Sequence, residues 1–305
     1  MLAVPLTMLF SVLVPSKMWY APEQAIPVTI QADGKFALVL TTFADAGVKK
    51  VDPDTSAEVE GKKAFDLRAI FKAVSSPGTY VLYASPAGKP AGEFVGTPLV
   101  IQSRQSKRGV EGTIVTKVQP LRYAAMTTDN GPIKMVFYYD VAPNTVDNFF
   151  MLSEEGYYDG LTFHRIVPGF VIQGGDPKGD GSGGPGYSIT AEFNDRKHET
   201  GVLSMARLGD PEEAPGVPPR AEYANSAGSQ FFVCLDYEAT KALDKGYTAF
   251  GKVIEGMEAV RAIAAVKLAD ERNGKPEKAP VIEKVQVKGV TAQDNPYATM
   301  LSVGK

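Results

Sequence analysis

One stretch of the chain, FHRIVPGFVIQGGD, combines a cation, an amide and apolar side chains without a nucleophile. Arg165 lies among apolar residues, and Gln173 begins a Gln-Gly-Gly-Asp turn further along the stretch. The stretch has no serine or cysteine, and its single carboxylate, Asp176, has no second carboxylate beside it. Covalent catalysis and a paired-acid mechanism therefore lack the residues they need. Any chemistry here must use hydrogen bonds, charge and apolar contact.

Other motifs in the sequence favour structural interpretations. The segment GDGSGGPG contains a formal G-x-G-x-x-G pattern over residues 179–184. Pro185 follows and no helical periodicity develops, so we interpret the segment as a surface loop and not as a dinucleotide site. The only cysteine, Cys234, stands in the apolar run QFFVCL, which predicts a buried thiol and excludes an intramolecular disulfide. Two histidines, His164 and His198, are too few for a His-rich cage, and we predict no metal site.

The bulk composition is that of two ordinary globular domains. The chain has 305 residues, of which 44% are hydrophobic and 22% charged. Its net charge of −3 argues against nucleic acid as a partner, because phosphate binding needs a basic surface.

The first fifteen residues, MLAVPLTMLFSVLVP, are apolar but too short to span a bilayer, and we expect no integral membrane span. They also lack the positive start and the small-residue cleavage site of a signal peptide. Segment 1–15 is therefore either a degenerate or truncated export signal or the first strand of a sheet. The first interpretation favours a periplasmic or secreted location over a cytoplasmic one, and the compartment stays open.

Residues 1–110 predict a small antiparallel β-sandwich. From residue 16 to about 104, short apolar runs alternate with Pro, Gly and Ser, and no long helical stripe develops. The run PGTYVLY, with Tyr80 entering a late strand, resembles the corner of immunoglobulin-like sandwiches that a tyrosine ties down. The polar segment 102–113 has the composition of a linker or exposed hairpin. The expected strands lie in IPVTIQ, FALVLTTF, AFDLRAIFKAV, SSPGTYVLYAS and TPLVIQS.

Residues 120–290 form a second predicted domain, which contains two helices. APNTVDNFFMLSEEG predicts a helix that Asn144 or the preceding turn caps and that Gly156 ends. GMEAVRAIAAVK predicts another, beginning after Gly256. The remaining residues, 291–305, carry no strong signal and are interpreted as a tail.

Several segments of this second domain together resemble one family. YYDVAPNTVDNFFMLSEEGYYDGLTFHRIVPGFVIQGGDPKGDGSGGPGY, GVLSMAR, NSAGSQFFVCL and LDKGYTAFGKVIEGM resemble the cyclophilins in order and spacing, from Tyr123 to Val287. The resemblance implies an all-β fold: a closed eight-stranded β-barrel capped by two helices, here preceded by the immunoglobulin-like β-sandwich. It also implies peptidyl-prolyl cis-trans isomerase activity on proline-containing polypeptides, which assists protein folding and needs no cofactor.

The resemblance also assigns roles to individual residues. Arg165 takes the place of the family's catalytic arginine, and Phe170 and Gln173 stand at the positions that assist it. Ala242 stands where many cyclophilins carry a tryptophan that helps hold cyclosporin, so we predict weak cyclosporin inhibition with catalysis retained. Tyr247 occupies a rim position where eukaryotic members often have histidine and many bacterial members have tyrosine. The implied substrate-binding residues are Ala206, Arg207, Gln230, Phe232, Leu243 and Tyr247.

The chemistry of the reaction agrees with these residues. Rotation about an X-Pro bond faces a barrier of about 18–20 kcal/mol because the amide is conjugated. The two isomers differ by only about 0.5–1 kcal/mol, so a catalyst must lower the barrier alone. Twisting returns a lone pair to the prolyl nitrogen, and a guanidinium that donates a hydrogen bond there stabilises the twisted state. No nucleophile is needed, because no covalent bond forms or breaks.

Two questions stay open at the level of sequence. The enlarged loop 208–224 is either a lid that tunes substrate choice or a neutral surface insertion. The barrel could also be a non-catalytic module that binds proline segments, or a scaffold, with the N-terminal domain as the main contact for another protein. The presence of Arg165 favours the hypothesis of an enzyme, because a module that only binds proline segments does not require this arginine.

Overall fold

The structure is a computed structural model that describes most of the chain. The described residues are 12–42, 49–50, 56–89, 93–106, 114–214 and 217–298. Much of the predicted export segment (1–11), of the linker (107–113) and of the tail (299–305) lies outside them. The chain divides into two compact units, a first unit of residues 1–122 with 289–305 and a second unit of residues 123–288. The sequence-based domain boundaries stay predictions about where each part can fold alone.

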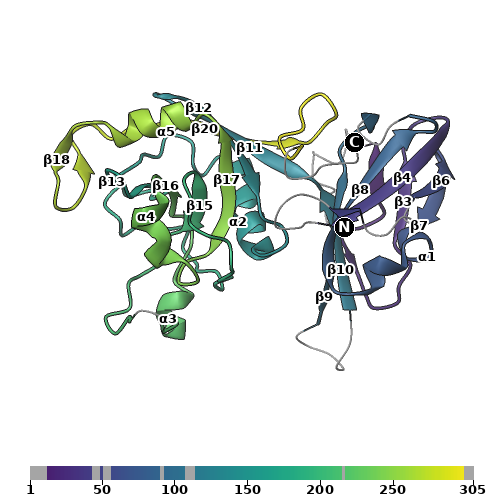
Figure 1. Ribbon diagram of the computed structural model, residues 1–305, viewed down its shortest axis with the longest axis horizontal. Coiled ribbons are helices and arrows are strands. Elements are labelled where there is room, and N and C mark those ends of the chain that lie inside the picture. Colours follow the sequence, from purple (N-terminus) through teal and green to yellow (C-terminus); the bar gives the residue numbers. More distant parts are fainter. Residues whose placement is uncertain are drawn as a thin grey trace. The chain divides into compact units, whose positions relative to one another are not determined.

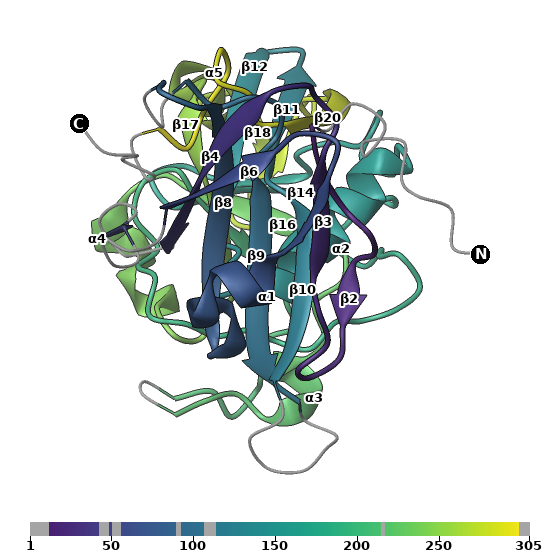
Figure 2. The same ribbon diagram turned by 90° about the vertical axis from the view of Figure 1, so that its right-hand side faces the viewer.

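Two antiparallel sheets make up the first unit, and Figure 2 shows β8, β9 and β10 of the larger one side by side. The smaller sheet has the order β1 (Leu13–Pro15), β3 (Pro27–Ile30), β7 (Ala64–Asp66). The larger sheet has the order β2 (Trp19–Tyr20), β10 (Ile114–Pro120), β9 (Leu99–Gln105), β8 (Gly78–Pro86), β4 (Lys35–Thr42), β5 (Lys49–Lys50), with β6 (Ser56–Glu60) also paired to β4.

The alternation of apolar residues explains why these strands form one core. In β4, Phe36, Leu38 and Leu40 are buried while the residues between them are partly exposed. Period-two burial is what a strand with one core-facing side requires. The same cluster includes Val28 and Ile30 of the smaller sheet, so both sheets share one hydrophobic core.

The strand predicted over AFDLRAIFKAV is wrong beyond Asp66. The Asp66 carboxylate accepts a hydrogen bond from the Arg68 backbone N–H (3.1 Å) and so caps a helical turn. Leu67, Phe71 and Val74 are then buried at helical spacing, a pattern that a short apolar run does not distinguish from a strand. The helical elements are α1 (Leu67–Ile70) and the 3-10 helix η2 (Lys72–Ser75).

The second unit is built on one eight-stranded sheet with few helices. Helix α5 (Met257–Ala264) lies against β12 and helix α2 (Pro143–Glu154) lies against β17 (Figure 1). The strand order is β13 (Arg165–Val167), β14 (Val171–Gly174), β16 (Phe231–Cys234), β15 (Val202–Met205), β17 (Ala249–Glu255), β12 (Gly131–Phe137), β11 (Arg122–Thr128), β20 (Ile282–Gly289). Smaller elements are α3 (Ala221–Ala224), α4 (Tyr237–Thr240), η4 (Lys241–Leu243) and the hairpin β18 (Leu268–Asp270) with β19 (Lys275–Pro276).

Helix α2 confirms a predicted helix, and of its two predicted caps only Asn144 is wrong, because the N-cap is Ala142 just before the helix. Asn144 lies inside the first turn and does not cap it. Glu192, from a distant loop, instead accepts hydrogen bonds from the backbone N–H groups of Asn144 (3.1 Å) and Thr145 (2.8 Å). A carboxylate at this end satisfies free N–H groups and opposes the helix dipole. The chain leaves the helix at Gly156, whose φ of 72° is favourable for glycine.

Residues 289–305, which include the predicted tail, belong to the first unit. Tyr297 of the tail and Val290 just before it are fully buried, and the Tyr297 hydroxyl donates to the carbonyl oxygen of Arg122 (2.8 Å). In the part of the chain that the structure describes, no helix is long and apolar enough to cross a membrane.

Candidate active site

A cavity of 210 Å³ in the second unit collects almost all of the predicted site residues. Val171 lines it too, although sequence reasoning did not single out this buried strand residue. Gln230, the one predicted residue outside the cavity, lines an adjoining one. The lining residues of the small cavity are Arg165, Phe170, Val171, Gln173, Ala206, Arg207, Phe232, Leu243 and Tyr247.

Strand register brings the key side chains together. Arg165 of β13 is the direct partner of Gln173 on β14, and Gln173 is the direct partner of Phe232 on β16. Directly opposed residues of antiparallel strands project from the same face of a sheet. The cation, the amide and the aromatic ring therefore form one row across three strands.

A chain of hydrogen bonds holds the guanidinium group of Arg165. Its Nη1 donates to Oε1 of Gln173 (3.3 Å), and Nε2 of Gln173 donates to Oε1 of Gln230 (2.9 Å). Nε2 of Gln230 donates in turn to the carbonyl oxygens of Gly181 (2.9 Å) and Gly183 (2.8 Å). The side chain of Arg165 is thus connected through two amides to the backbone of the glycine-rich loop.

The other side of the cavity is apolar. Phe232 is buried and packs edge-on against Tyr247, with ring centroids 5.8 Å apart. Phe170, Leu243 and Tyr247 pack as partly buried side chains on the same small cluster, beside Val171. These apolar side chains form a socket that suits an apolar ring.

Behind Phe232, a polar network that sequence reasoning missed fixes the loop that carries Leu243. His198 stacks on Phe232, and its ring nitrogens lie 3.0 Å from Oδ1 of Asp244 and 3.0 Å from Oγ of Ser204. Burial lowers the pKa of His198, and the hydrogen bond to Asp244 opposes part of this shift. His198 and Ser204 are fully buried, so their arrangement is structural and cannot present a nucleophile to substrate.

Two further sequence predictions, those for Cys234 and for the glycine-rich loop, are confirmed. Cys234 is a buried free thiol, as predicted, and burial raises its pKa to about 12. Residues 179–184 form a loop with no helix, which confirms the surface-loop interpretation. Among the residues that the structure describes, no group of three His, Cys, Asp or Glu side chains could hold a metal ion.

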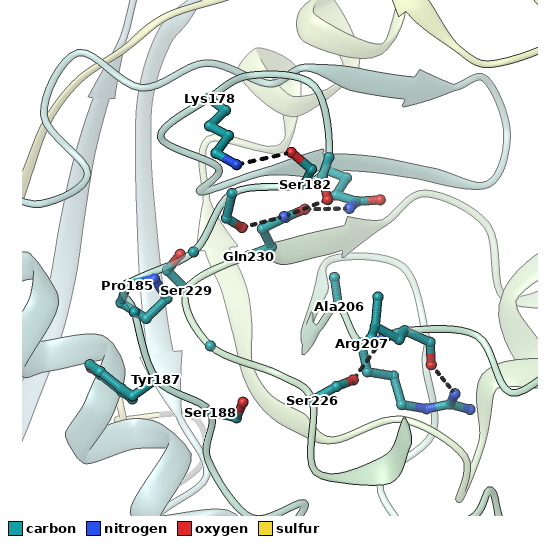
Figure 3. A pocket seen from close by; sticks show the side chains of 17 residues that line it. Lys178, Ser182, Pro185, Tyr187, Ser188, Ala206, Arg207, Ser226, Ser229 and Gln230 are labelled. Carbon is teal, nitrogen blue, oxygen red and sulfur yellow. Dashed lines mark hydrogen bonds between the residues drawn. The ribbon is translucent and has the colours of Figure 1, made fainter. Parts of the chain in front are cut away.

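The glycine-rich loop forms one wall of the adjoining cavity, which measures 640 Å³ (Figure 3). Asp176 is buried and organises the loop, accepting hydrogen bonds from the backbone N–H groups of Lys178 (2.8 Å), Asp180 (3.1 Å) and Gly181 (2.5 Å). In Figure 3, Lys178 and Gln230 lie at one end of this cavity and Arg207 at the other. Gln173, Ala206 and Arg207 line both cavities, so an extended ligand can pass from one to the other.

These features define a class of protein: a β-rich domain with a fixed cation beside an apolar socket, suited to non-covalent chemistry on an apolar peptide segment. The family model for cyclophilin type peptidyl-prolyl cis-trans isomerases matches residues 123–287. The chain belongs to this family, and the match covers more than half of its length. The predicted membership and isomerase activity are thereby confirmed.

Two named relatives agree with the family assignment, and one solved structure is reported beside them. A peptidyl-prolyl cis-trans isomerase of Synechococcus elongatus is 44% identical over 147 residues, which are 48% of this chain and 90% of the relative. Peptidyl-prolyl cis-trans isomerase B of Bacillus subtilis is 46% identical over 132 residues, 43% of this chain and 81% of the relative. A solved cyclophilin type isomerase of Cryptosporidium parvum is 30% identical with a TM-score of 0.48, covering 56% of this chain and 99% of that one.

Proposed function

We propose that the 210 Å³ cavity holds the X-Pro segment during isomerisation and that Arg165 is the catalytic group. The observation that carries this proposal is the environment of Arg165. The only hydrogen-bond partner of its guanidinium among the described residues is the neutral amide of Gln173, and no described carboxylate pairs with it. Its charge is therefore available to a bound peptide, at the edge of an apolar socket.

The prolyl ring enters the socket formed by Phe170, Phe232 and Leu243, with Tyr247 at the rim. Arg165 then donates to the prolyl nitrogen as the bond twists and that nitrogen gains a lone pair. This interaction exists in the twisted state and not in either planar isomer, so it lowers the barrier without favouring one isomer. A rate gain of roughly 10⁴–10⁶ requires about 5.5–8 kcal/mol of such stabilisation.

Gln173 and Gln230 orient Arg165 through the hydrogen-bond chain, and Gln173 can also donate to the substrate. The strand end at Ala206 and Arg207 holds the residue before the proline, since it lines both cavities. Preorganisation of this kind counts for catalysis, because the donors need not rearrange when the bond twists.

The proposed fold of the second unit is a closed barrel. Thr162 forms isolated bridges with both Asp176 and Val281. The Phe163 N–H donates to the carbonyl oxygen of Pro280 (2.9 Å). These contacts join the segment before β13 to the segment before β20, which are the two end strands of the sheet order, and so support closure.

For the first unit we propose an immunoglobulin-like sandwich that contacts another protein. The Tyr80 hydroxyl donates to the carbonyl oxygen of Ala73 (2.8 Å), the kind of bond that ties a corner in such sandwiches. Trp19 is 49% exposed, and the cations of Arg104 and Lys117 lie within 6 Å of its ring centroid. Comparing capture of partners by the full chain and by its Trp19→Ala variant tests the proposed contact.

The test of the active site is a protease-coupled isomerisation assay on an X-Pro peptide. Wild type is compared with Arg165→Ala and with Arg261→Ala, an exposed arginine on α5. We expect loss of catalysis in the first variant alone. Equal rates for wild type and Arg165→Ala would overturn the assignment and would favour a site that only binds proline segments.

A further inference from the structure

We propose that Glu213, in the enlarged loop 208–224, is a specificity-determining residue. It neutralises Arg207 at the rim of the cavity and thereby sets which charge is accepted on the residue before the proline. The proposal rests on the proposed function of the Arg165 cavity and deepens it. It also addresses the question that the sequence left open, because it places Glu213 of this loop in the site.

The contacts of Arg207 are the first step. Its side chain is only 2% exposed, and its guanidinium lies 4.2 Å from the ring centroid of Tyr247. Nε donates to the carbonyl oxygen of Gly246 (2.9 Å) and Nη1 to that of Leu208 (2.9 Å). Nη2 pairs with Oε1 of Glu213 (2.5 Å). The loop thus supplies the only carboxylate that pairs with Arg207 among the described residues.

The loop is braced so that Glu213 stays in place. The Asp210 carboxylate accepts hydrogen bonds from the backbone N–H of Arg220 (2.8 Å) and from its guanidinium (2.8 and 3.1 Å). These bonds clamp the two ends of the loop together, and Arg220 holds the pKa of Asp210 well below its usual range. The guanidinium of Arg220 also packs on the ring of Tyr223, at 4.8 Å from its centroid. The backbone N–H of Glu213 also donates to the carbonyl oxygen of Asp210 (3.0 Å), so the clamp restricts the position of Glu213.

The charge balance of the cavity follows from these contacts. Arg165 and Arg207 line the same 210 Å³ cavity, but only Arg207 has a carboxylate partner among the described residues. The pKa of Tyr247 reflects all of these groups: burial raises it most, Glu213 raises it further, and the two arginines lower it. In wild type, the site therefore offers one unbalanced cation for catalysis. Without the charge of Glu213 it would offer two.

The position of Arg207 identifies the part of the substrate that would sense this change. Arg207 lines both the proline socket and the larger cavity, so a peptide that passes between them places the residue before the proline near it. A second unbalanced cation there attracts an acidic side chain and repels a basic one.

The experiment measures kcat/KM for three peptides that differ only in the residue before the proline, which is Lys, Ala or Glu. In Glu213→Gln we expect the ratio of the Glu peptide to the Lys peptide to rise about three- to eightfold, as one unit charge about 7 Å away in a largely aqueous dielectric predicts. The change should lie mainly in KM, and the Ala peptide should stay within about twofold. At about 1 M salt the shift should shrink, because the Debye length is then only about 3 Å.

Two further variants separate charge from structure. Glu213→Asp keeps the charge and should restore the wild-type ratio. Glu212→Gln removes a neighbouring charge that is 75% exposed and pairs with Arg220, and it should leave the ratio unchanged. An unchanged ratio in Glu213→Gln, or an equal loss for all three peptides, overturns the proposal while the wild type remains active. If wild type isomerises none of the peptides, or if Arg165→Ala isomerises them as fast as wild type, the proposed function is overturned instead.

Discussion

A substitution at Gln230 tests whether the hydrogen-bond chain that holds Arg165 contributes to catalysis. Gln230→Leu keeps a side chain of similar size but removes three hydrogen bonds, one from Gln173 and two to the carbonyl oxygens of Gly181 and Gly183. Each such bond contributes about 0.5–1.5 kcal/mol net. Water can replace part of the loss, because these groups border an open cavity. A loss of about 2 kcal/mol in transition-state stabilisation corresponds to about a 30-fold fall in kcat/KM.

The assay is isomerisation of the Ala-Pro peptide by wild type, Gln230→Leu and Gln286→Leu. Gln286 is exposed on β20 and serves as the matched control, with activity expected within about twofold of wild type. Thermal unfolding of each protein checks that a loss of rate is not a loss of fold. If Gln230→Leu isomerises the peptide as fast as the control, the amides do not position Arg165 and the reasoning fails.

Two further predictions concern stability. Burial lowers the pKa of His198 below its unfolded value of about 6.5, so the folded state binds fewer protons than the unfolded state. The free energy of unfolding should therefore be highest above about pH 6.5 and fall as the pH drops below that value. Urea unfolding across this pH range measures it, and a free energy of unfolding that does not change with pH would contradict the prediction. In Gly183→Ala the new Cβ would lie 2.0 Å from Oδ1 of buried Asp176, so we expect a destabilisation of about 1–3 kcal/mol. Thermal unfolding measures this loss. The control is Gly184→Ala, which has open space around the new Cβ and should unfold like wild type.

The residues of the site could be predicted because the motifs that carry them resemble those of the cyclophilins. Arg165 and Gln173 also lie on adjacent strands of one hairpin, so a single local motif contains both of them. The contact of Gln230 with the glycine-rich loop could not be predicted in the same way. It joins residues nearly fifty positions apart, and nothing in the composition of that loop specifies which carbonyl groups turn inward.

The same distinction explains the corrections to the fold. Asn144 was one of the two caps predicted for its helix, but Glu192 from another part of the chain accepts the hydrogen bond of the free backbone N–H group of Thr145. The ordered part of the predicted tail is buried through Tyr297, whose partner is the backbone of Arg122. Local propensity describes what a segment can do, whereas a contact between distant segments decides what it does.

The measurement that tests the account most directly is the cis-trans exchange rate of an X-Pro peptide, followed by NMR exchange spectroscopy with a catalytic amount of enzyme. This experiment observes the rotation itself, without a coupling protease. The account predicts rapid exchange with wild type and exchange near the uncatalysed rate with Arg165→Ala, at equal concentration and with both proteins folded. Undiminished exchange with Arg165→Ala would contradict it, because the cation beside the apolar socket would then not be the group that stabilises the twisted bond.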